Sequence, residues 1–203
     1  MIKILKTDLS LISQNLLFGS VGIMPSDTVY GIFARALNSA SVERIYSIKK
    51  RDLNKPFIIL ISDISDLDTL GIKLSDRQFS FVNKYWPGPL SLIFDCKDSK
   101  LEYLHRRTNS LAIRLPKDDW LRSLIKITGP LVAPSANLQN FPTVKIIDEA
   151  VNIFGDKVDF YVNGGICEGK PSTLVRFNNN KFEVLRSGCL EINNEDTFGT
   201  LIK

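Results

Sequence analysis

Four cations within seven positions form the strongest candidate for chemistry in this sequence. They lie in the segment KKRDLNKP, residues 49–56, between an expected helix and an apolar run. A triphosphate carries several anionic oxygens, and one arginine with two lysines can bind them through forked and point-charge contacts. Cations at the end of a helix also stabilise its dipole. The segment therefore predicts either a polyphosphate clamp or a solvated helix end.

A second candidate is the loop PSAN, residues 134–137, which follows the apolar residues 131–133. It places a hydroxyl and an amide in a tight loop after a strand, where open α/β sheets bind ligands. An ordinary turn is the alternative. Ser135 is not expected to be a covalent nucleophile, because the sole histidine, His105, is remote in sequence and no G-x-S-x-G motif surrounds the serine.

The glycine-rich stretch 163–173 is a third candidate, because its glycines let the backbone approach a ligand closely. It is not a phosphate-binding P-loop, since Pro171 separates Lys170 from the hydroxyl pair that follows. No G-x-G-x-x-G follows a strand either, so the sequence does not support a dinucleotide fold.

The segment PSDTVYG, residues 25–31, offers an acceptor at Asp27 and a hydroxyl at Thr28. Arg114 lies in a strand that is otherwise apolar, residues 111–115. An inward-pointing arginine is costly unless it meets an anion. That anion is either the carboxylate of a ligand or an internal aspartate or glutamate.

Strands and helices interleave along the chain, which predicts an α/β fold with a mixed sheet. Helical spacing of apolar residues predicts helices over 9–17, from Ser39 or Ser41 to about 49, and over 75–85, 118–127 and 145–154. Short β-rich runs predict strands at 21–24, 57–61, 90–94, 111–115, 131–133 and 160–162, and a hairpin of 174–177 with 181–185.

The composition is that of an ordinary globular domain. Of 203 residues, 44% are apolar and 24% charged, which excludes a disordered chain and a long coiled coil. No apolar run approaches a membrane span, and the N-terminus does not have the pattern of a signal peptide. The net charge of +4 permits an anionic ligand without requiring nucleic acid. Three cysteines without metal-ligand spacing predict free thiols in a reducing cytoplasm.

Six motifs occur in a characteristic order: SDTVYG, KKRDLNKP, WPGPLS, AIRLP, APSAN and GG-x-C-x-G-x-x-ST. Together they resemble the YrdC/Sua5 family of threonylcarbamoyl-adenylate synthases, over roughly residues 10–188. The resemblance implies a catalytic domain over residues 1–190 with a polar tail over 191–203. It also implies a twisted mixed β-sheet with flanking helices around a large basic concave cleft.

The resemblance further implies a reaction. L-threonine, bicarbonate or CO₂, and ATP would give threonylcarbamoyl-AMP and pyrophosphate, for the modification of adenosine 37 in tRNA. Mg²⁺ would travel on the ATP phosphates, with no metal site of the protein's own. A transferase complex, contacted transiently, would then act on tRNA, so that contact with tRNA is indirect and no membrane is involved.

Site residues follow from the same resemblance. Those expected to contact threonine are Thr28, Arg114, Ala133 and Ser172. Those expected to carry catalysis are Lys49, Arg51 and Lys55. Those expected to bind ATP are Arg51, Lys55, Ser110, Ser135, Asn137, Thr143 and Arg186.

The sequence departs from the usual family pattern at four positions. Ser26 replaces a common Thr, Asp52 a Pro, Leu60 a His, and Asn163 an Asp. None of these changes removes a cation of the segment 49–56. Two alternatives remain: a double-stranded RNA- or tRNA-binding module of the same fold, and a related enzyme that forms a carbamoyl-adenylate. The small net charge disfavours the first, and the chain length disfavours the second.

Overall fold

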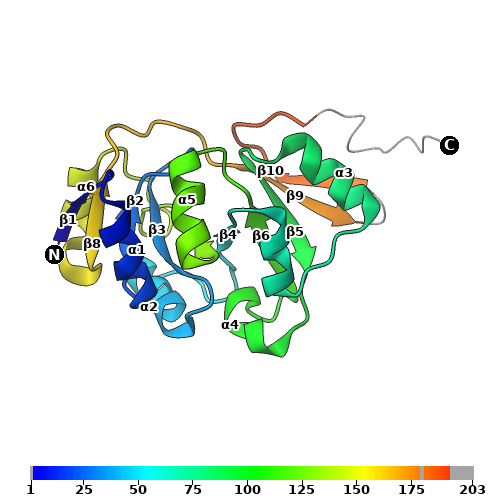
Figure 1. The fold of residues 1–203 in the computed structure, drawn as a ribbon, viewed down its shortest axis with the longest axis horizontal. Helices are drawn as coiled ribbons and strands as arrows, with labels where there is room; N and C mark the ends of the chain where they lie inside the picture. Colours follow the sequence, from blue (N-terminus) through cyan, green and yellow to red (C-terminus); the bar gives the residue numbers. More distant parts are fainter. Residues whose placement is uncertain (1, 179–180, 193–203) are drawn as a thin grey trace.

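The computed structural model describes residues 2–178 and 181–192 of the chain (Figure 1). One mixed sheet runs through these residues in the order β1-β8-β2-β3-β7-β4-β6-β5-β9-β10. Its strands are β1 (Ile2–Leu5), β2 (Gly22–Met24), β3 (Gly31–Arg35), β4 (Ile58–Leu60), β5 (Leu90–Asp95), β6 (Ser110–Arg114), β7 (Leu131–Val132), β8 (Phe160–Asn163), β9 (Thr173–Asn178) and β10 (Lys181–Arg186). The predicted α/β class with a mixed sheet is confirmed.

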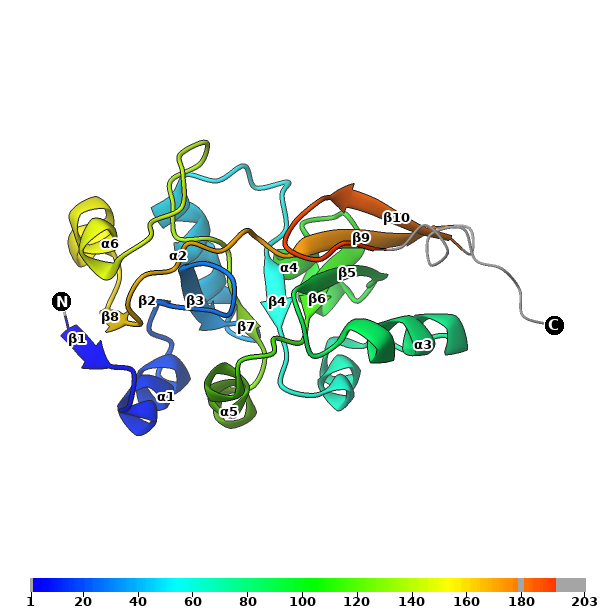
Figure 2. The same cartoon turned by 90° about the horizontal axis from the view of Figure 1, so that it is seen from above.

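Helices cover both faces of this sheet. The α-helices are α1 (Leu9–Leu17), α2 (Ser39–Lys49), α3 (Asp76–Tyr85), α4 (Glu102–His105), α5 (Asp119–Thr128) and α6 (Ile147–Phe154). Three 3₁₀ segments join them: η1 (Ile64–Leu70), η2 (Ser99–Leu101) and η3 (Gly155–Lys157). Seen from above, α1 and α5 lie along one side of the sheet, and α2 and α6 along the other (Figure 2).

The two helical layers bury separate apolar clusters. Ile12 and Leu16 of α1 pack with Leu124 of α5 in one cluster, and Val42 of α2 and Phe154 of α6 belong to the other. Burial of such side chains contributes roughly 1.5–3 kcal/mol each, which is the main stabilisation of the sheet between them. A ligand site is therefore left to the loops and to the part of the sheet that these helices do not cover.

Local signals position several helices as expected. The Asp8 side chain accepts the N–H of Leu11 at 3.0 Å and starts α1. Ser75 and Gln78 form a reciprocal capping box at the start of α3. Helix α2, however, is capped by Asn38, whose side chain accepts the N–H of Ser41. The predicted Ser39 or Ser41 cap is wrong, because the Ser41 hydroxyl instead donates to the carbonyl of Gly19 at 2.6 Å.

Other boundaries also differ from the sequence-based expectation. Helix α6 begins at Ile147 instead of Lys145, because the Glu149 carboxylate accepts the N–H of Lys145 at 2.7 Å and holds the preceding residues outside the helix. The short strands β1 and β3 were not predicted. The domain boundary expected at residue 190 stays a prediction. Residues 193–203 of the expected tail lie outside the described residues. No helix among the described residues has the length and apolar character needed to cross a bilayer.

Candidate active site

A cavity of about 360 Å³ opens over the face of the sheet formed by β4, β6, β5 and β9. The pairing of these strands places four residues side by side on the floor of the cavity. Ala112 of β6 lies opposite both Ile58 of β4 and Ile93 of β5, and Ile93 lies opposite Arg176 of β9. Residues paired in this way share one face, because successive side chains of a strand alternate between faces. The floor is thus largely apolar, with arginines at its edges.

The charged side chains that line the cavity are all cationic among the described residues. They are Arg51, Lys55, Arg114, Arg176 and Arg186. Hydroxyl groups lie between them, at Ser26, Thr28, Thr108, Ser110, Ser135 and Ser172. Such a lining favours an anionic ligand with several oxygen atoms, and an apolar floor suits a flat or aliphatic group of the same ligand.

The segment 49–56 turns sharply at the end of α2. Lys50 adopts the left-handed conformation (φ 50°) that ends the helix. The chain then curls back, so that Arg51 Nε donates to the carbonyl of Lys55 at 3.0 Å and its guanidinium lies 5.4 Å from the ring centroid of Phe57. Arg51 is half-buried and Lys55 exposed, and both reach the same cavity.

Lys49 faces the other way and lies behind the cavity wall. It is 2% exposed, and its ammonium donates to the carbonyl oxygens of Ser135 and Asn137 at 2.5 and 2.6 Å and to Asn137 Oδ1 at 3.0 Å. Burial, with a smaller effect of the Arg51 charge, lowers the pKa of Lys49 to about 7. Lys49 thus holds the loop 134–137 and lies outside the cavity lining, and its expected catalytic role stays a prediction.

The Asn137 side-chain amide makes hydrogen bonds within the same loop. Ser135 Oγ donates to Asn137 Oδ1 at 2.7 Å, and Asn137 Nδ2 donates to the carbonyl of Phe141 at 2.6 Å. Ser135 lines the cavity together with Ala133, while Asn137 supports the loop from behind. Asn137 is therefore placed as a structural partner of Ser135 and Lys49.

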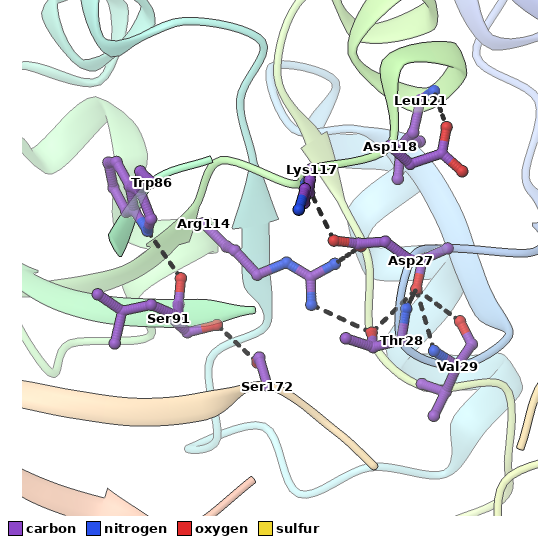
Figure 3. Close-up of polar contacts among 12 residues, drawn as sticks. Asp27, Thr28, Val29, Trp86, Ser91, Arg114, Lys117, Asp118, Leu121 and Ser172 are labelled. Carbon is purple, nitrogen blue, oxygen red and sulfur yellow. Dashed lines mark hydrogen bonds and ion pairs between the residues drawn. The ribbon is translucent and has the colours of Figure 1, made fainter. Parts of the chain in front are cut away.

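Figure 3 shows Arg114 between Asp27 and Thr28. Its guanidinium is ion-paired with the Asp27 carboxylate and donates from Nη1 to Thr28 Oγ1 at 3.1 Å. The second oxygen of Asp27 accepts the backbone N–H of Lys117 at 3.1 Å. The anion that Arg114 meets in this structure is internal. Burial lowers the pKa of Arg114, and the charge of Asp27 opposes that shift.

Ser172 is supported from behind in a similar way. Its hydroxyl lies 2.8 Å from the hydroxyl of Ser91, which is fully buried in β5 (Figure 3). Arg186 donates from Nη2 to the carbonyl of Ser172 at 2.9 Å. These contacts fix both Ser172 and Arg186 at the cavity wall.

The stretch 163–171 passes directly over the loop that carries Thr28. The Tyr30 hydroxyl donates to the carbonyl of Gly165 and accepts the N–H of Gly164, both at 2.9 Å. A Cβ atom on Gly169 would lie 2.2 Å from the Thr28 carbonyl oxygen, so this position requires glycine. The glycines of this stretch thus serve close contact between backbone segments.

The sequence of this chain matches proteins of a known family. Residues 14–188 match the Sua5/YciO/YrdC family, described as "Telomere recombination". The chain belongs to this family. A Methanocaldococcus jannaschii relative is 30% identical over 188 residues, 92% of this chain and 88% of its own length. The threonylcarbamoyl-AMP synthase of Bacillus subtilis is 34% identical over 143 residues, 70% of this chain and 41% of that protein.

Solved structures of the Sua5/YciO/YrdC family have the same fold. Pyrococcus abyssi Sua5 complexed with L-threonine superimposes with a TM-score of 0.88 at 25% identity, over 98% of this chain and 60% of that chain. Escherichia coli YciO has a TM-score of 0.83 at 20% identity, over 94% and 96% of the two chains. This chain therefore spans 41% of the Bacillus subtilis relative and 60% of the Pyrococcus abyssi Sua5 structure.

The structure brings most of the family-derived site residues to one cavity. Nine of them line it: Thr28, Arg51, Lys55, Ser110, Arg114, Ala133, Ser135, Ser172 and Arg186. Three lie outside its lining: Lys49, Asn137 and Thr143. Their contacts with a ligand remain predictions.

Several lining residues were missed from the sequence. Arg176, Thr108 and Ile93 border the cavity beside Ser110 and Ala112. Alternation along 174–177 places Leu174 and Arg176 on one face, but only the pairing of β9 with β5 shows which face meets the cavity.

The described residues hold no group of three or more His, Cys, Asp or Glu side chains that could bind a metal.

Proposed function

We propose that this chain is a threonylcarbamoyl-AMP synthase, which joins L-threonine, bicarbonate or CO₂, and ATP. The observation that carries the proposal is the single cavity in which Thr28 and Arg114 meet the cationic pair Arg51 and Lys55 from a distant segment. The names of the Bacillus subtilis and Pyrococcus abyssi relatives, and the threonine bound in the Sua5 structure, support it.

The proposed reaction needs no protein nucleophile. The neutral amine of threonine attacks the carbon of CO₂ and loses a proton to solvent, which gives an N-carboxylate. An oxygen of that carboxylate attacks the α-phosphorus of ATP, the bond to the bridging oxygen breaks, and pyrophosphate leaves. Negative charge develops on phosphate oxygens, where Arg51 and Lys55 stabilise it electrostatically. Mg²⁺ enters as part of the MgATP substrate.

We further propose that the substrates occupy different parts of the cavity. The amino acid occupies the end formed by Thr28, Ala133 and Ser172, and the phosphates occupy the cationic segment of Arg51 and Lys55. Holding the reactants in line supplies much of the rate enhancement, because the orientation is established before the chemical step. This division matches the chemistry of the residues at each end.

The proposal extends to the cellular role. The enzyme acts as a nucleotidyltransferase in the cytoplasm and releases threonylcarbamoyl-AMP to a transferase complex that modifies adenosine 37 of tRNA. Because the cavity has the size of a small-molecule site, tRNA itself is not a ligand of it.

The deciding experiment measures pyrophosphate release from ATP and bicarbonate, with and without L-threonine, and identifies the adenylate by mass spectrometry. We expect pyrophosphate release to depend on threonine and to yield threonylcarbamoyl-AMP. Release that is equally fast without threonine would exclude this synthase activity and favour a different carbamoyl-adenylate. Binding of RNA that weakens steeply with salt, in place of turnover, would favour the nucleic-acid module.

A further inference from the structure

We propose that Asp27 is a positioning residue for the amino-acid substrate. It acts through Arg114 to make the Thr28 hydroxyl a hydrogen-bond donor toward the ligand. Only the identity of that ligand rests on the proposed function. The contacts that carry the inference are those among Asp27, Arg114 and Thr28 (Figure 3), together with the hydrogen bonds of Ser26.

Asp27 is held rigidly behind the cavity. Its side chain is 13% exposed and that of Arg114 is 5% exposed, so their ion pair is shielded from solvent. One oxygen of Asp27 accepts a hydrogen bond from the Arg114 guanidinium, and the other accepts the backbone N–H of Lys117. Thr28 and Arg114 line the cavity, whereas Asp27 lies outside its lining. Asp27 therefore orients the groups that meet a ligand without meeting it.

The hydrogen bonds around Thr28 determine the direction of its hydroxyl. A guanidinium only donates, so Thr28 Oγ1 accepts from Arg114 Nη1 at 3.1 Å. The Ser26 hydroxyl donates its own hydrogen to the carbonyl of Val29, at 2.7 Å. In the 3.0 Å contact between the two hydroxyls, Thr28 is consequently the donor.

The Thr28 hydroxyl can give up its hydrogen bond to Ser26 and donate to a ligand instead. Ser26 Oγ already accepts the N–H groups of Thr28 and Val29 at 3.2 Å, so three donors compete for its two lone pairs. The Thr28 hydrogen can turn to an acceptor in the cavity with little loss. The site therefore selects a ligand oxygen, such as a carboxylate or hydroxyl of the amino acid, at this position.

The ion pair also lowers the positive charge beside Thr28. Asp27 neutralises Arg114, while Arg51 and Lys55 face the cavity without a buried carboxylate beside them among the described residues. An anionic ligand is attracted more strongly to Arg51 and Lys55, whose nearby carboxylate is the exposed Asp52, than to the neutral pair of Asp27 and Arg114. Asp27 thus weakens the attraction of Arg114 for a polyphosphate.

The first test is Asp27→Asn, with steady-state pyrophosphate release measured while L-threonine and ATP are varied separately. We expect the KM for L-threonine to rise about tenfold or more, a typical effect of removing the partner that orients a ligating group, and the KM for ATP to change less than twofold. An unchanged KM for threonine in the folded variant would overturn the inference, as would equal rises for both substrates.

Asp159→Asn is the matched control. Asp159 likewise pairs with an arginine, Arg44, and accepts a backbone N–H, from Val21 at 2.7 Å, but it lies outside the cavity lining. We expect this variant to lose stability without a change in either KM.

A double-mutant comparison separates action through Arg114 from direct contact with the substrate. In the Arg114→Met background, adding Asp27→Asn should leave the KM for threonine unchanged, because the group through which Asp27 acts is already gone. A further rise would overturn the inference. If either single variant does not fold, the double variant, which contains no unpaired buried charge, is compared directly with wild type, and an unchanged KM for threonine there would overturn the inference. A wild-type enzyme without threonine-dependent turnover would instead count against the proposed function.

Discussion

The ammonium of Lys49 donates to the carbonyl oxygen of Ser135, 86 residues further along the chain. The contact ties the end of α2 to the loop that supplies Ser135 to the cavity. Two positions later, Arg51 lines the cavity itself. The lysine and the arginine of one basic segment thus have different places: Lys49 holds a loop from behind, and Arg51 lines the cavity.

Replacement of Lys49 by Met should release the loop 134–137. Three acceptors would lose the Lys49 ammonium, and the loop that carries the Ser135 hydroxyl would be less firmly fixed at the cavity. We expect kcat/KM to fall about tenfold to a hundredfold, measured by pyrophosphate release. The neighbouring Lys50→Met is the control, because Lys50 is exposed and its replacement should leave turnover near wild type. Equal activity of the two variants would contradict the role of Lys49.

The stability of the protein should depend on pH through Lys49. Its folded pKa of about 7 lies below the ordinary value of 10.5, so the folded state binds this proton less tightly than the unfolded state. The resulting destabilisation is complete below about pH 7 and fades as the pH rises toward 10.5, by about 1.4 kcal/mol per unit. Urea unfolding between pH 7 and 9 should show wild type gaining stability relative to Lys49→Met. Parallel curves for the two proteins would show that the pKa is not lowered.

Removal of either cation at the phosphate end should nearly abolish turnover. We expect Arg51→Ala and Lys55→Ala each to lower kcat/KM roughly 10²–10³-fold, because each removes a charged donor from the developing negative charge. Circular dichroism should show that both variants stay folded. Lys97→Ala, at an exposed lysine outside the cavity lining, is the control. Normal turnover in both cavity variants would exclude the phosphate clamp.

Ser91→Ala tests the buried support of Ser172. Without the Ser91 hydroxyl, the Ser172 hydroxyl loses its 2.8 Å partner and keeps only the longer contact from Arg186 Nη2, at 3.3 Å. We expect a loss of about 1 kcal/mol in unfolding free energy and a several-fold rise in the KM for threonine. The control is Ser13→Ala, which removes a buried hydroxyl that donates to the carbonyl of Ser10 far from the cavity. It should lower stability alone, and a matching change in KM there would contradict the assignment.

Sequence alone predicts the elements whose signals are local. The Asp8 side chain caps α1, and Ser75 with Gln78 caps α3, as nearby residues dictate. The order of the six motifs also identifies the family, because each motif is a short run whose residue types and spacing can be compared directly. These features depend on neighbours within one or two turns.

Tertiary structure alone decides the direction of side chains at the site. The left-handed turn at Lys50 sends Lys49 into the interior and Arg51 into the cavity, although the sequence lists both as cations of one segment. The sequence also left the anionic partner of Arg114 undecided, and the structure shows that it is Asp27, 87 residues away in the chain. Likewise, Arg176 meets the cavity only because β9 pairs with β5. Contacts of this kind depend on chain segments that are distant in sequence, so no local pattern can specify them.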